Sequence, residues 1–446
     1  MYNPIVPRDY QVVGIERMRN EMRLLNTDAP GLGKTMQAVF ASEVPVLISV
    51  PNYLVGQWGE WLRGEDEQSR ERNDGEVYPN VVGRVVVATG TRGAKNRALR
   101  ARADWTVINH QMFRTHLALI EKIAKTGFWK TLIIDESHYV KNHSAAISKG
   151  ALKISKLIPR CYLLSATPVK REIDDLYMQF KILHPDLFPS YNKFIDYYCV
   201  TDKSEWGVKV LGSKKKTRGE LMELLDVMRI GRSYAQAGRS LPPVIEKYIT
   251  IDLPPETRKL YDDAMNNFRV QFEQEETHHY FSYIEVYHQL RQLVTGAFKW
   301  DAVIEALSDE VHKSVIFTWY KPTAYEIGKM FKGPIEVVTG DIKDPDERRK
   351  LAKRDTHCVC TISSMSEGVD LSDARTVIFA EEDWTPGANY QALSRVVRDR
   401  NDDGENMEPV IVYYVHCKNT IDQIIHRRSK KRTGTIKELM TEALYQ

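Results

Sequence analysis

The chain has 446 residues, of which 63 are Lys or Arg and 60 are Asp or Glu, and its formal net charge is +3. Hydrophobic residues make up 42% and charged residues 28%, which is typical of globular proteins and excludes a collagen-like, coiled-coil or wholly disordered chain. The sequence has no run of about 18 apolar residues and no secretory signal at its start. We therefore expect two or three domains, no membrane segment and a cytoplasmic location.

The predicted strands are short apolar runs rich in β-branched residues, with helix-like stretches between them. Continuous apolar runs suit strands of a parallel sheet that is buried on both faces. Two separate sets of such runs predict an α/β protein with two parallel-sheet domains in tandem. The first set is 44–50, 84–88, 105–109, 131–134 and 161–164, and the second is 314–318, 335–339, 358–362, 376–380 and 409–415.

A different kind of sequence separates the two sets. Residues 186–300 contain a basic run, Lys214–Arg218, two Leu-Pro-Pro breaks and a long helical pattern over 256–294. We expect domain 1 at 1–185, a linker with a helical insertion at 186–300, and domain 2 at 301–446 with a basic tail at Arg427–Arg432. The highly charged stretch 63–79 predicts an irregular surface loop.

The five cysteines are dispersed, and no two of them have the spacing of zinc ligands. Cys358 and Cys360 alternate along an apolar run, so we expect both on one face of a strand. We expect all five to be reduced thiols: Cys161, Cys199, Cys358, Cys360 and Cys417.

A glycine-rich run predicts a phosphate site. Gly31-Leu32-Gly33-Lys34-Thr35 resembles a P-loop, although Asp28 stands where the first glycine of the motif would be. Backbone N–H groups of such a turn point at phosphate oxygens, and the helix that follows adds its positive end. We expect Lys34 to reach the β- and γ-phosphates and Thr35 to ligate Mg²⁺. The residues expected around the phosphates are Pro30, Gly31, Leu32, Gly33, Lys34 and Thr35. Alone, the run also fits an ordinary glycine turn.

Two acids at the end of a predicted strand complete this chemistry. The run 131–134 leads directly into Asp135-Glu136-Ser137-His138. We expect Asp135 to hold Mg²⁺, directly or through water, and Glu136 to polarise the attacking water. An ordinary polar turn after a strand is the alternative, but the P-loop upstream favours hydrolysis of a nucleoside triphosphate.

The first half carries a family resemblance. Asp135–His138 is a variant of the DEAH box of superfamily 2 helicases and translocases, and Tyr139–Asn142 extends it to the form typical of the Swi/Snf-type branch. Ser165-Ala166-Thr167-Pro168 resembles motif III, and Arg8–Gln11 resembles the Q-motif. Residues 182–190 are similar to a segment of annealing-helicase-type fork remodellers.

The second half continues the resemblance in the family's order. Ser366–Leu371 is similar to motif V, Asp383–Pro386 to the D-W-x-P run, and Gln391–Arg398 to motif VI. Leu290-Arg291-Gln292 resembles the helix before the second domain. The chain ends soon after motif VI, which resembles compact bacteriophage or bacterial forms and implies the cytoplasm of a bacterium or of a phage-infected host.

The resemblance implies two RecA-like domains that use ATP and Mg²⁺ and share one nucleotide site. It assigns Arg8, Gln11, Gly368 and Asp370 to the cofactor, with Gln11 reading adenine. It also implies that Arg398 is an arginine finger and Arg395 a second contact to the γ-phosphate, so that hydrolysis follows domain closure.

DNA is the partner that the resemblance implies, as duplex, fork or junction, bound through sequence-independent and salt-sensitive phosphate contacts. The basic runs 214–218 and 427–432 fit either further phosphate contacts or solvated faces. Trp58 and Trp61, at i and i+3, favour core packing over base stacking. The residues that family position assigns to DNA are Pro51, Asn52, Gln57, Trp58, Asn109, Thr167, Ser363 and Ser364.

Three functions follow as hypotheses. The first is a monomeric DNA-dependent ATPase that translocates on double-stranded or branched DNA. It would remodel forks or migrate branches in replication, recombination or repair, and proteins of those processes are its expected partners. The second is a strand-separating DNA or RNA helicase of the DEAH type, which Ser165–Pro168 favours. The third is a nucleotide-regulated binding module with little motor activity, which Glu136 and the two arginines of motif VI oppose.

Overall fold

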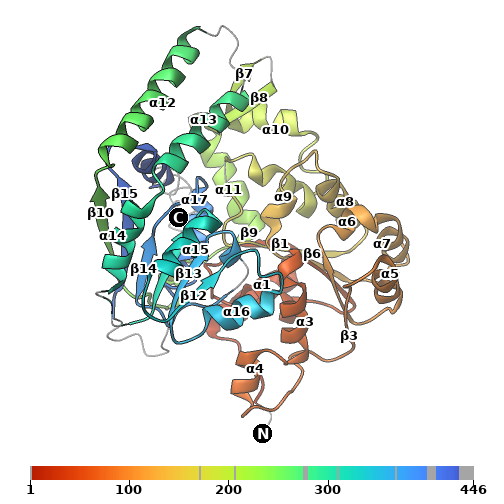
Figure 1. Cartoon of the computed structure of the whole chain (residues 1–446). Helices are drawn as coiled ribbons and strands as arrows, with labels where there is room; N and C mark the ends of the chain where they lie inside the picture. The colour runs from red at the N-terminus through yellow and green to blue at the C-terminus, as the bar shows by residue number, and fades with distance from the viewer. Residues whose placement is uncertain are drawn as a thin grey trace. The chain divides into compact units, whose positions relative to one another are not determined.

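The computed structural model describes residues 3–169, 172–204, 207–274, 280–308, 310, 312–366, 369–398 and 408–430. The chain folds as two compact units, Met1–Arg239 and Ser240–Thr435 (Figure 1). Each unit is built on its own parallel sheet, and the expected α/β class with two parallel-sheet domains is confirmed.

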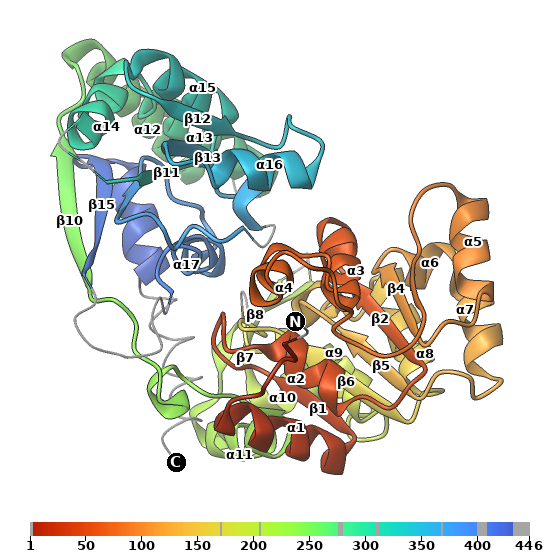
Figure 2. The same cartoon turned by 90° about the horizontal axis from the view of Figure 1, so that it is seen from below.

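The first sheet has seven strands in the order β3-β4-β2-β5-β6-β1-β9, with parallel pairing throughout. Figure 2 labels the strands between its two edges, β4, β2, β5, β6 and β1. All five apolar runs expected in this half are strands. The sequence did not predict β1 and β9, because β1 has only two apolar residues and β9 has two residues in total, one of them Arg229. The strands are β1 Arg23–Asn26, β2 Val46–Val50, β3 Val85–Val87, β4 Trp105–Asn109, β5 Thr131–Ile134, β6 Arg160–Leu164 and β9 Arg229–Ile230.

Helices cover both faces of this sheet, so each strand contributes to two apolar layers. Along β5, Leu132 and Ile134 pack into one layer and Ile133 into the other, as the continuous apolar run predicted. The helices are α1 Asp9–Glu21, α2 Lys34–Ala41, α3 Val55–Arg63, α4 Glu67–Arg72, α5 Arg92–Arg100, α6 Met112–Thr115, α7 Leu117–Ala124, α8 Ala146–Ser155, α9 Asp175–Leu183, α10 Tyr191–Tyr198 and α11 Arg218–Met228.

The charged stretch 63–79, expected to be an irregular loop, contains α4. The side chain of Asp66 accepts a hydrogen bond from Ser69 N at 3.1 Å, and this N-cap starts the helix. The prediction of a loop was therefore wrong for these residues, because a local cap outweighs their poor hydrophobicity.

The second sheet has six strands in the order β10-β15-β14-β11-β13-β12, again with parallel pairing throughout. The five apolar runs expected here are all strands, and Cys358 and Cys360 pack into the same apolar layer. All five cysteines are buried free thiols. The strands are β10 Val244–Ile251, β11 Ser314–Thr318, β12 Ile335–Val338, β13 His357–Thr361, β14 Thr376–Phe379 and β15 Val410–Cys417.

The helices of the second unit follow its strands along the chain (Figure 1). Residues 421–430 add a helical segment after β15, so the described part of the basic tail, 427–430, is helical, and Lys431 and Arg432 lie outside the described residues. The others are α12 Pro255–Gln274, α13 Tyr280–Leu293, α14 Ala297–Ser308, α15 Lys321–Met330, α16 Pro345–Ala352 and α17 Pro386–Leu393.

Residues 186–300, expected as a linker and helical insertion, are divided between the two units. The first unit takes the antiparallel hairpin of β7 Cys199–Ser204 and β8 Gly207–Ser213, then α11 and β9. The second takes β10, which pairs with β15 along all eight residues, and the helices α12 and α13. Backbone pairing of β9 and β10 with two different sheets decides this division, and the proline breaks do not.

None of the helices in the described part of the chain is both long enough and apolar enough to span a bilayer.

Candidate nucleotide site

The predicted phosphate and magnesium residues lie at one edge of the first sheet. Strands β5, β6 and β1 are consecutive neighbours and run in the same direction. Their carboxyl ends lead into Asp135–His138, Ser165–Pro168 and the P-loop run, respectively. The carboxyl edge of a parallel sheet is where ligands bind in open α/β folds, so three motifs predicted separately come together there.

The P-loop makes a tight turn into a helix. Gly31 and Gly33 have φ values of 82° and 78°, which side chains rarely adopt, and α2 begins directly after Gly33. The ammonium of Lys34 donates to the carbonyl oxygens of Asp28 at 2.7 Å and Ala29 at 3.2 Å. The loop therefore presents backbone N–H groups and one lysine at the start of α2, a combination suited to phosphate.

Asp28 explains the departure from the P-loop pattern. Its carboxylate is fully buried and accepts hydrogen bonds from Arg232 Nη2 at 2.6 Å, Arg232 Nε at 3.0 Å and Gln37 Nε2 at 2.9 Å. Arg232 follows β9, and Gln37 is on α2. The carboxylate thus ties the start of the loop to two other elements. Sequence reasoning missed Arg232, because the pairing spans 204 residues and no local pattern marks the partner.

The Q-motif contacts the P-loop directly. The side-chain amide of Gln11 donates to Leu32 O at 3.2 Å, and its oxygen accepts from Arg8 N at 2.8 Å. The hydroxyl of Tyr10 lies 3.4 Å from Leu32 O. Burial raises the pKa of Tyr10, so its phenol is a donor at neutral pH. Both polar ends of Gln11 are therefore engaged with backbone groups.

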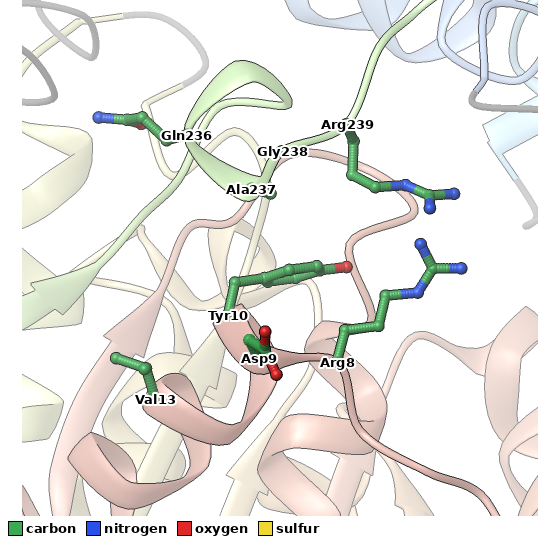
Figure 3. Close-up of a pocket in the computed structure, with 8 residues that line it drawn as sticks. All are labelled: Arg8, Asp9, Tyr10, Val13, Gln236, Ala237, Gly238 and Arg239. Atoms are coloured by element: carbon green, nitrogen blue, oxygen red, sulfur yellow. The ribbon is translucent and has the colours of Figure 1, made fainter. Parts of the chain in front are cut away.

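A pocket of about 450 Å³ adjoins this turn. Figure 3 shows the Tyr10 ring in this pocket, with the guanidinium groups of Arg8 and Arg239 near its hydroxyl end. One aromatic face with two nearby cations is a surface suited to a flat, electron-rich ring. The lining residues are Arg8, Asp9, Tyr10, Val13, Gln236, Ala237, Gly238 and Arg239.

Asp135 is a constrained carboxylate. One oxygen accepts the indole N–H of Trp58 at 2.9 Å, and the other accepts Glu136 N at 2.8 Å. Burial, followed by the negative charge of Glu136, raises the pKa of Asp135 to about 6. A cation beside this carboxylate would offset both effects, as expected of a magnesium ligand.

Glu136 has a strained backbone conformation, and its side chain contacts His138. Its φ of 46° lies in the left-handed region, which costs free energy for a residue with a side chain. Its Oε2 lies 3.1 Å from His138 Nδ1, which in turn lies 3.3 Å from Ser165 Oγ. The DEAH-type box is therefore connected to motif III through His138.

Two further side chains support this edge. His110 Nδ1 lies 2.8 Å from Ser49 Oγ, and burial, then the neighbouring His138, lower the pKa of His110 to about 3. His110 is therefore neutral at physiological pH. Ser137, which replaces the alanine of the DEAH box, donates to Gln179 Oε1 at 2.7 Å. That bond satisfies a hydroxyl that would otherwise be buried without a partner.

The DNA contacts predicted for the first unit differ in exposure. Asn109 Nδ2 donates to the exposed Asn52 at 2.9 Å, so these two residues come together at the ends of β4 and β2. Trp58 is 4% exposed, and its ring packs in the core, which agrees with the packing that its spacing favoured. In this conformation it offers no face to a base. Pro51 and Thr167 are buried, and Gln57 is half-buried.

In the second unit, motifs V and VI meet. Arg398 Nη1 lies 3.1 Å from Asp370 Oδ2, and Arg398 Nε donates to Ser394 O at 3.2 Å. Burial would raise the pKa of Asp370, but Arg398 lowers it overall below its usual value. The backbone oxygen of Arg395 accepts Leu371 N at 3.0 Å. Gly368 lies outside the described residues.

Residues 13–297 match the family model of the SNF2-related domain, and residues 298–400 match that of the helicase conserved C-terminal domain. The chain belongs to the SNF2-related family. This confirms the resemblance to the Swi/Snf-type branch. Among curated relatives, it is 25% identical to the SWI/SNF-related matrix-associated actin-dependent regulator of chromatin subfamily A-like protein 1 of Xenopus tropicalis, over 91% of this chain and 42% of that protein.

A second relative is the DNA annealing helicase and endonuclease ZRANB3 of Mus musculus, with 25% identity over 92% of this chain and 38% of that protein. The chain thus spans about two fifths of the length of these relatives. Among solved structures, the Sulfolobus solfataricus SWI2/SNF2 ATPase core in complex with dsDNA covers 99% of this chain and 96% of its own, at 19% identity and a TM-score of 0.43.

Two other motifs of this SNF2-related chain are linked inside the second unit. Arg291, from the L-R-Q helix, is 2% exposed, and its guanidinium lies 4.2 Å from the Trp319 ring centre and 5.6 Å from that of Trp384. The indole of Trp319 donates to Asp383 at 3.1 Å. Sequence reasoning missed Trp319, which no motif includes.

The motif V serines differ in what they can contact. Ser364 is buried, and its hydroxyl donates to Thr361 O at 2.8 Å and Val338 O at 3.0 Å. Ser363 is exposed. Of this pair, only Ser363 presents its side chain to solvent, so it is the better candidate for a phosphate contact.

Proposed function

We propose that this chain is a DNA-dependent ATPase that translocates on double-stranded or branched DNA. One observation carries the proposal: Lys34 of the P-loop, Asp135 and Glu136 of the DEAH-type box and Ser165 of motif III all follow adjacent strands at one edge of the first sheet. Phosphoryl transfer to water needs a cation, a magnesium ligand and a carboxylate that orients the water. Lys34, Asp135 and Glu136 would supply these three groups.

ATP and Mg²⁺ are the proposed cofactors, and the magnesium ion would supply charge neutralisation for the phosphates. Lys34 and the N–H groups at the start of α2 bind the phosphate chain in this proposal. Thr35 and Asp135 hold the ion. Glu136, positioned by its contact with His138, orients a water molecule and accepts its proton.

We assign the adenine to the Tyr10 pocket. The ring of Tyr10 supplies a stacking face, and Arg8 and Arg239 lie near its hydroxyl end (Figure 3). Because both ends of Gln11 contact backbone groups, Gln11 contributes by holding this turn against the P-loop. A role in reading the base directly would require it to exchange one of these hydrogen bonds.

Arg395 and Arg398 are the proposed γ-phosphate contacts from motif VI. Arg398 is paired with Asp370, so it has to exchange this carboxylate for a phosphate in order to act. In this exchange a phosphate takes the place of the Asp370 carboxylate as the anionic partner of Arg398. Arg398 therefore leaves Asp370 only when a phosphate is close enough to bind it. Hydrolysis would then depend on a conformational step, as translocation requires.

Fork remodelling and branch migration in replication, recombination or repair are the proposed biological roles. The relative described as a DNA annealing helicase supports them. We further propose that the protein is monomeric, acts in the cytoplasm of a bacterium or of a phage-infected cell, and works with replication or recombination proteins. Asn52 and Ser363 are the proposed DNA contacts that are exposed, whereas Asn109 is buried and bonded to Asn52.

Strand separation remains the second candidate, because the hairpin of β7 and β8 presents apolar side chains to solvent. Val200, Val208 and Leu211 are 44%, 48% and 54% exposed. An exposed apolar hairpin is a feature that a duplex-opening pin would need. The Ser-Ala-Thr-Pro form of motif III, Ser165–Pro168, is the other feature that favours this function.

The test is the steady-state ATPase rate without nucleic acid and with single-stranded DNA, duplex DNA, a model fork, a four-way junction and RNA. We expect strong stimulation by duplex or branched DNA. Stimulation mainly by single strands or RNA would support the strand-separating helicase instead. A rate unaffected by every nucleic acid would contradict both.

A further inference from the structure

Three potential metal ligands converge in the second unit, apart from the nucleotide residues. Glu382 follows β14, His416 is on β15, and His426 is on the helical segment 421–430. One potential ligand atom from each lies within 4.8 Å of the others. The three elements are fixed by the sheet and by the packing of 421–430, so the side chains are held together by the fold.

The contacts among these side chains are short and centred on one oxygen. Glu382 Oε2 lies 3.0 Å from His416 Nε2 and 2.8 Å from His426 Nδ1. All three residues are at most 9% exposed. Ligand atoms around a tetrahedral zinc ion are about 3.3 Å apart, given bonds of about 2.0–2.1 Å. The two separations from Glu382 Oε2 would therefore lengthen by a few tenths of an ångström around an ion, and all three ligand atoms already lie within 4.8 Å of one another.

In the described part of the chain, the carboxylate of Glu382 bonds to His416 and His426 and to no lysine or arginine. Lys430 is the nearby base, and its ammonium contacts Glu246 and the hydroxyl of Tyr248. Its charge is therefore balanced outside the triad. The rings of Tyr414 and His426 lie 4.7 Å apart, so an aromatic wall limits water on one side. Glu382 is left with two imidazoles as its side-chain partners.

We propose that Glu382, His416 and His426 form a binding site for one Zn²⁺ ion in the second unit. Two imidazole nitrogens and one carboxylate oxygen are a donor set that suits zinc and related divalent ions of borderline softness, with a water as fourth ligand. Magnesium prefers oxygen ligands in an octahedral arrangement and does not suit this set. The site is thus distinct from the proposed magnesium site in the first unit.

The ion would brace the end of the second unit. It joins the end of β14, strand β15 and the segment 421–430, which carries Arg427 and Arg428. Glu382 also accepts a hydrogen bond from Arg291 through its backbone oxygen, beside the D-W-x-P run. Occupancy therefore orders the basic helical segment against a family motif, and this proposal does not depend on ATP hydrolysis.

The test uses the untagged full chain, stripped of metal and titrated with Co²⁺ as a spectroscopic substitute for Zn²⁺. We expect one Co²⁺ per chain with visible absorption bands of tetrahedral coordination, displaced by Zn²⁺ and unaffected by excess Mg²⁺. At zinc concentrations about 100 times the dissociation constant, the unfolding temperature should rise by roughly 5 °C or more. Absence of stoichiometric binding would mean a hydrogen-bonded triad only and would overturn the proposal.

Variants identify the ligands. Glu382→Gln and His416→Gln should each weaken Co²⁺ binding by at least about 100-fold, since even outer partners of metal ligands typically account for 10–100-fold. The exposed His312→Gln is the matched control and should bind like the wild type. His426→Cys should retain the ion and add a thiolate-to-cobalt charge-transfer band, which distinguishes ligation from a folding effect. Unchanged binding in Glu382→Gln or His416→Gln, or a bound ion without that band, would overturn the assignment.

Discussion

Two Arg–Asp pairs, one in each unit, lie in contrasting environments. Arg232 and Asp28 are 13% and 0% exposed, and several hydrogen bonds join them beside the P-loop. Arg398 and Asp370 are 20% and 32% exposed, and one contact of 3.1 Å joins them. The same two residue types thus make a fixed structural joint in the first unit and an exchangeable contact in the second.

The physical reason is the cost of separation. Removing one partner of a buried pair leaves an uncompensated charge, whereas water readily replaces the partner of a more exposed pair. The Arg232–Asp28 pair therefore fixes the P-loop before any ligand binds. The Arg398–Asp370 pair can separate and release Arg398. On the proposed function, this difference separates a site that binds nucleotide from a group that acts during turnover.

The largest expected effect is on turnover in Arg398→Ala. If Arg398 acts as an arginine finger, ATP hydrolysis should fall by about 10³-fold or more. The free energy of unfolding of this variant should differ from that of the wild type by no more than about 1 kcal/mol, because the Arg398–Asp370 pair is partly exposed. Steady-state ATPase rates with duplex DNA and urea unfolding measure the two effects. A large loss of stability would place Arg398 in the same class as Arg232.

Arg232→Ala should show the opposite balance. It leaves the Asp28 carboxylate buried without its cation and should lower the free energy of unfolding by about 3–5 kcal/mol. Urea unfolding of the full chain measures this. The double variant Asp28→Asn, Arg232→Met removes both charges and should recover part of the loss. If Arg232→Ala is as stable as the wild type, the Arg232–Asp28 pair does not stabilise the fold beside the P-loop.

Asp135→Asn gives a smaller effect with a defined pH dependence. Because the folded pKa of Asp135 is about 6, above the unfolded value of about 3.9, the folded state binds more protons between these values. This group's contribution to stability therefore falls as the pH rises from about 4 to 6. Asparagine has one acceptor oxygen for the two donors that face Asp135, which lowers the stability of the variant by the same amount at every pH. Relative to the wild type, the variant should therefore gain on the order of 1 kcal/mol in free energy of unfolding between pH 5 and pH 8.

Urea unfolding at both pH values measures this difference. Glu136 lies next to the site, so Glu136→Gln is the matched comparison and should lessen the pH dependence by removing a neighbouring negative charge. A stability difference between Asp135→Asn and the wild type that is the same at pH 8 and pH 5 would show that the carboxyl is not perturbed.

The sequence predicted those parts of the molecule that depend on neighbours along the chain. The P-loop turn, the acids after β5 and the buried strands are all local patterns, and the structure has the strands and turns where they were expected. The assigned roles of the site residues remain predictions.

What could not be predicted depends on distant pairing. Arg232 reaches Asp28 across 204 residues, and β9 becomes a strand only because β1 offers backbone partners. The prolines before β10 suggested a linker, yet its pairing with β15 makes it a strand. The spacing of Trp58 favoured core packing, but its hydrogen bond to Asp135 joins residues far apart in the chain, and no spacing rule specifies it.

The most direct test of the central claim, that the edge around Glu136 hydrolyses ATP, compares Glu136→Gln with the wild type for ATP affinity and for turnover with duplex DNA. The exposed Glu16→Gln on α1 is the control. We predict an unchanged ATP dissociation constant and a fall in turnover of about 10²–10⁴-fold, the usual contribution of a general base. Turnover at the wild-type rate in Glu136→Gln would contradict the account.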